Sequence, residues 1–97
     1  MEKFAILARV EAKAGKESDV EQFLKNALAL AQEEEETVAW YALKIGPSTF
    51  GIFDTFNNEE GREAHLAGKI AAALMEHAGE LLSAPPQIEK VDLLAVK

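Results

Sequence analysis

Short runs of apolar, β-branched and aromatic residues alternate along the chain with longer stretches of helical periodicity. The strand-like runs occupy residues 3–12, 38–45, 49–56 and 87–96. In the first run, every second residue is apolar on one face, and the first half of the other face is apolar as well. We therefore expect the first strand to be buried on both faces over its first half.

Two regions between these runs have the period of a helix. Apolar residues recur at helical spacing from Val20 to Ala31, and Ser18 with Glu21 has the form of a capping box. We expect this first helix to extend from Ser18 to about Glu35. The run Glu33 to Glu36 near its end is typical of a solvated helix face.

The second helical region is broken in two. Asn57 followed by Glu60 is an N-cap signal for a short helix that ends near Gly68. A further helix is expected from about Lys69 to Leu82. It ends there because the two prolines at 85 and 86 prevent it from continuing.

The two central strands are separated by Gly-Pro-Ser, a short loop that suits an antiparallel hairpin. With residues 46–48 as the loop, the register places Tyr41 opposite Phe53 and Trp40 opposite Asp54. Gly51, inside the third strand, indicates a bulge or a close approach of another group to the backbone.

The order β-α-β-β-α-β is typical of a ferredoxin-like α+β fold, with a four-stranded antiparallel sheet and helices on one side. The 97 residues are enough for one domain, which we place at 1–97. The helices can cover only one face of the sheet, yet both faces carry apolar residues. We therefore expect a homodimer in which two sheets pack face to face.

Composition excludes several classes of function. The chain has 10 basic and 17 acidic residues and a net charge of -7, which disfavours nucleic acid as a partner. It has no cysteine and only two histidines, so we expect no metal site and no cofactor bound through thiolates. No apolar run is long enough to span a membrane, and charges interrupt the first residues, so we expect a cytoplasmic protein without a signal peptide.

Several stretches together resemble the antibiotic biosynthesis monooxygenase family of dimeric α+β barrels. They are ARVEAKAGKESDVEQFL, WYALKIGPSTFGIFDTF, EAHLAG and PPQIEKVDLL. The resemblance implies a homodimer with a pocket between sheet and helices in each protomer. It also implies oxidation of phenolic or quinol-like substrates by molecular oxygen without metal or flavin, although other members degrade haem or act as isomerases, so fold membership alone selects no reaction.

Three functional positions follow from this resemblance: His65 in the A-H-L segment, Tyr41 in the second strand and Asp54 near the end of the third. The chain departs from the family at Phe56, where a tryptophan is common, and at 69–70, where many members have a second histidine. It also lacks the asparagine that the haem-degrading branch has on its first strand, so haem degradation is disfavoured.

The two histidines differ in their expected roles. His65 is either a general base or hydrogen-bonding group for a phenolic hydroxyl, since imidazole titrates near neutral pH, or a structural helix histidine bonded to a carboxylate or carbonyl. His77 lies at the edge of the apolar stripe of the last helix, which favours a packing or surface role.

The neighbouring candidates also have two interpretations each. Trp40 and Tyr41 point to opposite faces of the sheet, and one of them could line a pocket for a flat aromatic molecule, or both could fill core and interface. Asp54 needs a partner if it is buried. The alternatives are the Trp40 indole, Arg9, or His65, which Asp54 would orient.

We therefore predict a monooxygenase acting on a small aromatic molecule, with His65 as base or orienting donor and the other candidates at the substrate. Two alternatives remain: an isomerase working by proton transfer through His65, and a binding or interaction module whose histidines are structural. The substrate-binding candidates are Trp40, Tyr41, Phe53, Asp54 and Phe56, although the two phenylalanines could equally be core.

Overall fold

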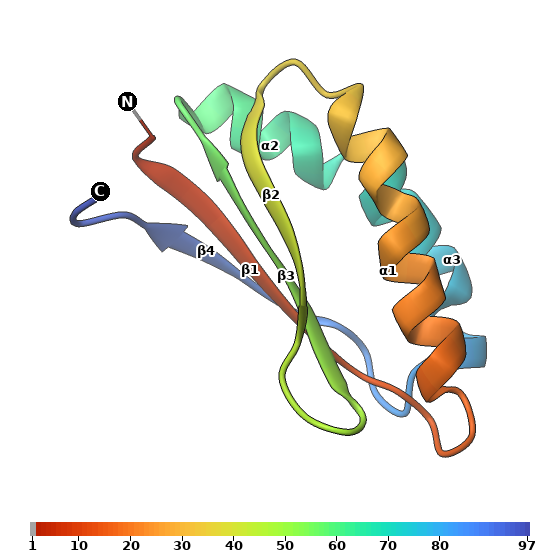
Figure 1. Ribbon diagram of the computed structural model, residues 1–97. Coiled ribbons are helices and arrows are strands. Elements are labelled where there is room, and N and C mark those ends of the chain that lie inside the picture. Colours follow the sequence, from red (N-terminus) through yellow and green to blue (C-terminus); the bar gives the residue numbers. More distant parts are fainter. Residues whose placement is uncertain (1) are drawn as a thin grey trace.

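The computed structural model describes residues 2–97, which follow the order expected from the sequence (Figure 1). All strand pairs are antiparallel, and the strand order in the sheet is β2-β3-β1-β4. The three helices lie on one side of this sheet (Figure 1), which confirms the ferredoxin-like α+β prediction. The elements are β1 (Phe4–Glu11), α1 (Glu17–Gln32), β2 (Thr37–Lys44), β3 (Thr49–Phe56), α2 (Glu59–Leu66), α3 (Lys69–Leu81) and β4 (Gln87–Asp92).

The hydrophobic core lies between the helices and the sheet. β1 and β3 occupy the middle of the sheet and contribute every second residue to this core, as the period-two pattern predicted. Phe50 and Phe56, near opposite ends of β3, are 1% and 0% exposed. α1 contributes four buried residues of its apolar stripe to the cluster that contains Phe50, namely Val20, Leu24, Ala27 and Ala31.

The predicted hairpin register is confirmed. Tyr41 pairs with Phe53 and Trp40 pairs with Asp54 between β2 and β3. Gly51 is a place of close approach: a Cβ at this position would lie 2.8 Å from the backbone oxygen of Ala8 on β1.

Replacing Gly51 with alanine should therefore force the two central strands apart. We expect a loss of about 1–3 kcal/mol in the free energy of unfolding, measured by urea denaturation. The backbone oxygen of Ala8 cannot rotate away from the added Cβ as a side chain could, so the strands themselves must move. Gly79→Ala is the comparison, since nothing lies within 4 Å of its added Cβ. There alanine should stabilise α3 by about 0.5–1 kcal/mol. Equal effects at both positions would contradict the steric explanation.

The helix termini differ from the prediction. α1 begins at Glu17 after Lys16, without a side-chain cap, so the capping box at Ser18 is wrong. The reason is the preceding turn: Gly15 has a positive φ and its N–H is accepted by the carboxylate of Glu17, while the carbonyl of Lys16 accepts the N–H of Val20.

Two further boundaries are corrected. α1 ends at Gln32 and not near Glu35, because the residues after it form the connection to β2. The cap of α2 is Asn58 and not Asn57; its side chain accepts the N–H of Gly61 at 2.7 Å. The chain breaks between α2 and α3 at Gly68, as expected.

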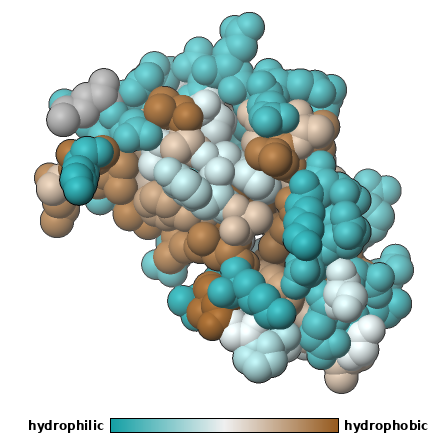
Figure 2. Space-filling view, in the orientation of Figure 1, coloured by the Kyte–Doolittle hydropathy of each residue, from teal (hydrophilic) through white to brown (hydrophobic). Residues whose placement is uncertain are grey.

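The sheet face opposite the helices carries a large apolar patch, and no helix or strand among residues 2–97 covers it. Figure 2 shows brown and pale side chains over the strands, whereas the helices at the right of the view are mostly teal. Tyr41 is 55% exposed on this face. Its partner Phe53 and the β1 residue Leu7 are partly exposed beside it. Among the described helices, none is long and apolar enough to cross a membrane.

Candidate active site

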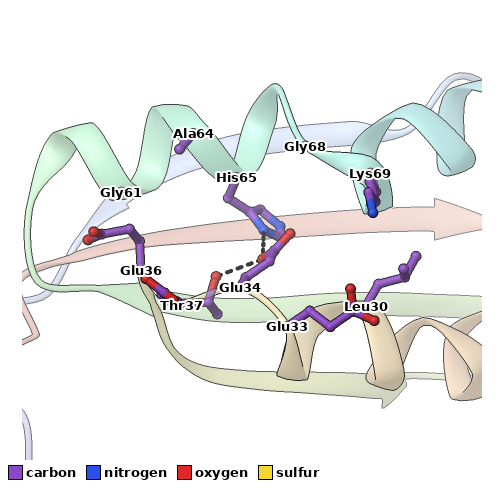
Figure 3. A pocket seen from close by; sticks show the side chains of 11 residues that line it. Leu30, Glu33, Glu34, Glu36, Thr37, Gly61, Ala64, His65, Gly68 and Lys69 are labelled. Atoms are coloured by element: carbon purple, nitrogen blue, oxygen red, sulfur yellow. Dashed lines mark hydrogen bonds and ion pairs between the residues drawn. The ribbon is translucent and has the colours of Figure 1, made fainter.

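The imidazole of His65 lies between two carboxylates. His65 is 8% exposed, near the end of α2. Its Nδ1 lies 2.7 Å from Oε1 of Glu34, a hydrogen bond drawn in Figure 3, and its Nε2 lies 2.8 Å from Oδ2 of Asp54. The ring also packs against Phe56, with 5.4 Å between the ring centroids. Both nitrogens are therefore engaged inside the protein.

Local structure explains how α2 brings the histidine to this position. The Asn58 cap starts the helix so that His65 falls on its inner side in the last turn. Gly61 lets the helix approach the connection between α1 and β2, since a Cβ there would lie 3.1 Å from the Cβ of Glu36. Arg62 fixes the helix to the sheet: its guanidinium lies over the Phe4 ring and donates to a backbone carbonyl of β4.

Asp54 is the buried end of this arrangement. It is 0% exposed, and within the described residues no donor has hydrogen-bond geometry to either of its oxygens. The contact with His65 is short but not aligned as a hydrogen bond, so it acts mainly as an ion pair. Of the three partners considered, the structure selects His65. Arg9 is exposed on the far side of the sheet, and the indole nitrogen of Trp40 has no hydrogen-bond partner in the described part of the chain.

Glu34 is the exposed end. Its side chain is 21% exposed, and its Oε1 accepts from both His65 and the hydroxyl of Thr37. The expectation that the whole run Glu33 to Glu36 forms a solvated face is wrong for Glu34. Nothing in the run distinguishes this glutamate from its neighbours, because the turn after α1 decides which one points inward.

Burial and the two carboxylates act in opposite directions on His65. Burial lowers the pKa of the imidazole, while the charge of Asp54 and then the charge and hydrogen bond of Glu34 raise it. The carboxylates prevail, and the pKa lies above the ordinary 6.5. The native state therefore holds this proton to a higher pH than the unfolded chain does.

This shift predicts a pH dependence of stability. The contribution of His65 should be fully present below about pH 6.5 and should be lost as the pH rises through the raised pKa. The slope is at most about 1.4 kcal/mol per pH unit for one proton. Urea unfolding between about pH 6 and pH 9 measures it. Asp54→Asn should flatten this slope, and a slope unchanged in that variant would contradict the assignment.

A pocket of about 300 Å³ opens beside His65 and Glu34. Its walls come from the end of α1, the connection to β2, α2 and the first residue of α3 (Figure 3). On the other side of the imidazole, Asp54 faces an apolar space of only about 30 Å³, too small for an aromatic ring. A ligand of useful size must therefore meet the Glu34 side. The pocket residues are Leu30, Glu33, Glu34, Glu35, Glu36, Thr37, Gly61, Ala64, His65, Gly68 and Lys69.

The structure divides the predicted site residues between the two faces of the sheet. Trp40, Asp54 and Phe56 lie on the helix side with His65. Tyr41 and Phe53 lie on the open face, so the structure does not bring them together with His65 within one protomer, and their role in substrate binding stays a prediction. Strand alternation is the reason, since adjacent residues of β2 and β3 point to opposite faces.

The second histidine is not part of this pocket. His77 is exposed on α3 and its ring meets the edge of Phe23, with centroids 5.7 Å apart. Within residues 2–97, no three histidine, aspartate or glutamate side chains are placed to hold a metal ion. Asp54, His65 and Glu34 form a line and do not converge on one point.

One solved structure is closely similar over the whole chain. It is the NE2512 protein of unknown function from Nitrosomonas europaea, with 60% sequence identity and a TM-score of 0.98 over 100% of this chain and 94% of that one. This chain belongs to the NE2512 family. No family model matches it, and no curated protein does.

More distant structures show which fold the NE2512 family has. One is a candidate antibiotic biosynthesis monooxygenase from Nitrosomonas europaea, with 11% identity, a TM-score of 0.82 and coverage of 95% and 90% of the two chains. Another, from Caulobacter crescentus, carries the same candidate description, with 12% identity, a TM-score of 0.80 and coverage of 97% and 92%. The chain therefore has the antibiotic biosynthesis monooxygenase fold, as its sequence predicted.

Proposed function

We propose that the pocket beside His65 is an active site that removes a proton from the hydroxyl of a small aromatic molecule. The observation that carries this proposal is the buried imidazole held between two carboxylates at the wall of a 300 Å³ pocket. A buried, charged hydrogen-bonded centre is costly to maintain and is a common feature of catalytic sites. A continuous space that reaches the ring favours chemistry over a purely structural histidine.

We further propose that the reaction is a monooxygenation of a phenol or quinol by molecular oxygen. The candidate monooxygenase descriptions of two neighbours with the same fold support this choice. Loss of the hydroxyl proton raises the electron density of the aromatic ring. Electron transfer from the ring to oxygen then becomes easier, and this is the contribution that a protein without metal or flavin can make.

Oxygen uptake tests the proposal. Purified protein is mixed with a panel of naphthalene and anthracene quinols, and dissolved oxygen is followed against a blank that corrects for autoxidation. We expect uptake above the blank for at least one quinol, with formation of a hydroxylated product or quinone. Uptake equal to the blank across the panel would remove the oxygenase assignment.

An isomerase is the second candidate. The arrangement of His65 between Glu34 and Asp54 suits proton transfer, and proton transfer by itself needs no oxygen. The same pocket and the same residues would serve it. Anaerobic turnover separates the two: an isomerase continues without oxygen, and a monooxygenase stops.

We also propose that the chain works as a homodimer in the cytoplasm, with the open sheet faces packed together. Their apolar character supports this arrangement, since soluble monomers rarely expose a large apolar patch. Tyr41→Glu should convert dimers to monomers in light scattering, because Tyr41 stands on that face with 55% exposure. Leu28→Glu, at 45% exposure on α1, is the control and should leave the mass unchanged. A monomeric wild type at micromolar concentration would contradict the proposal.

A further inference from the structure

The contacts of the imidazole determine which group a substrate can reach. Nδ1 is bonded to Glu34 and Nε2 faces Asp54, so neither nitrogen is turned toward the pocket. The Oε1 atom of Glu34 already accepts two hydrogen bonds. Its Oε2 lies on the side of Gly68, a residue of the pocket wall, where an added Cβ would come within 3.3 Å of it. Figure 3 shows this carboxylate beside the imidazole, among the side chains that line the pocket.

We propose that Glu34 is the catalytic residue that accepts the proton of the substrate hydroxyl, and that His65 is a positioning residue held as an imidazolium between Glu34 and Asp54. This inference rests on the proposed function and changes the identity of its base. Asp54 has a separate role, because it balances the charge of the ring from the buried side.

The charges of these three groups explain why the arrangement works. Two carboxylates and one imidazolium leave the cluster with one excess negative charge, in a site where only Glu34 is partly exposed. Because Asp54 cancels the charge of the imidazolium, Glu34 faces a neutral ion pair and not a lone cation. Without Asp54, the imidazolium would hold Glu34 as its only counterion and oppose its protonation.

The proton step is balanced within the site. The O–H bond of the substrate breaks, and its proton forms a new O–H bond at Oε2 of Glu34. The substrate keeps the electron pair and becomes an oxyanion, while the cluster becomes neutral. Nδ1–H of His65 continues to donate to Oε1 of Glu34, so the acid formed stays in position for returning the proton.

A carboxylate base also restricts the class of substrate. Efficient proton transfer needs acid and base of similar strength, and a carboxylate is a weaker base than a neutral imidazole. The matching hydroxyl is therefore a phenol or enol made acidic by a conjugated carbonyl or similar withdrawing group. Such a molecule must enter the pocket uncharged, because the glutamates at 33, 35 and 36 that line it would repel an anion. Among the lining residues, Lys69 supplies a positive charge.

Absorption of 4-nitrophenol tests the assignment, since its neutral and ionised forms have different spectra. We expect wild-type protein to bind it mainly as phenolate under mildly acidic conditions, and not to ionise the weaker acid 4-methylphenol. Glu34→Gln should lower the bound phenolate fraction about tenfold. Glu60→Gln removes the same charge from an exposed position of α2 outside the pocket and should behave as wild type.

The outcomes separate this inference from the proposed function. If Glu34→Gln retains the wild-type phenolate fraction, Glu34 is not the base, although the pocket still binds phenols. If neither phenol binds at millimolar concentration, the proposed phenolic substrate class is wrong, and this inference falls with it.

Nitrogen-15 NMR of the imidazoles gives a readout that needs no ligand. At neutral pH we expect both nitrogens of His65 to carry protons in the wild type. A His65 ring with one unprotonated nitrogen would overturn the positioning role and return the base to His65.

Discussion

Replacing His65 with leucine should lower the free energy of unfolding by about 3–5 kcal/mol. The variant leaves Asp54 with no exposed surface and without the cation that balances it. Glu34 loses a partner too, but its partly exposed side chain can turn to water at smaller cost. Urea denaturation measures the loss.

A second substitution makes this prediction sharp. Adding Asp54→Leu to His65→Leu should recover most of the stability, because a buried ion pair can usually be replaced by apolar residues of similar size without loss. The double-mutant cycle then gives the coupling between the two side chains. A cost below about 1 kcal/mol for His65→Leu alone would mean that Asp54 carries no charge in the native protein.

The largest expected effect on catalysis comes from the same histidine. His65→Gln should reduce turnover of a quinol substrate about 10²–10⁴-fold, the usual contribution of acid–base catalysis, because Glu34 then loses the imidazolium that positions it. Glutamine fills a similar space and can still donate to one carboxylate, but it cannot carry the positive charge. Turnover is measured below the melting temperature of the variant, so that unfolding does not imitate a catalytic loss.

His77→Gln is the matched control for this measurement. His77 is the other histidine of the chain and is exposed on α3, away from the pocket. It should keep wild-type turnover. Equal losses in both variants, or no loss in His65→Gln, would end the assignment of the pocket as an active site.

The fold was predictable because its signals are local and repeated. Period-two apolarity placed β1, and the Gly-Pro-Ser loop fixed the register that pairs Trp40 with Asp54. Capping was less predictable, since α1 begins after Lys16 without a side-chain cap and Asn58, not its neighbour Asn57, caps α2.

The candidate site was predictable only in part. His65 and Asp54 could be singled out by the resemblance, and Asp54 also because a carboxylate within an apolar strand needs a partner if it is buried. The sequence could not identify Glu34, which is one of four consecutive glutamates. Nor could the resemblance show that Tyr41 and Phe53 belong to the other face of the sheet, away from the pocket.

The three acid–base groups come from segments that are distant along the chain. Glu34 and His65 are 31 positions apart, and Asp54 belongs to a strand between them. Their meeting requires that β3 has joined the sheet and that α2 has docked, so it depends on contacts of high sequence separation, which generally form late in folding. In refolding experiments followed by NMR, the native signal of the His65 imidazole should therefore appear after the helices have formed. Its appearance would show that the whole domain has folded.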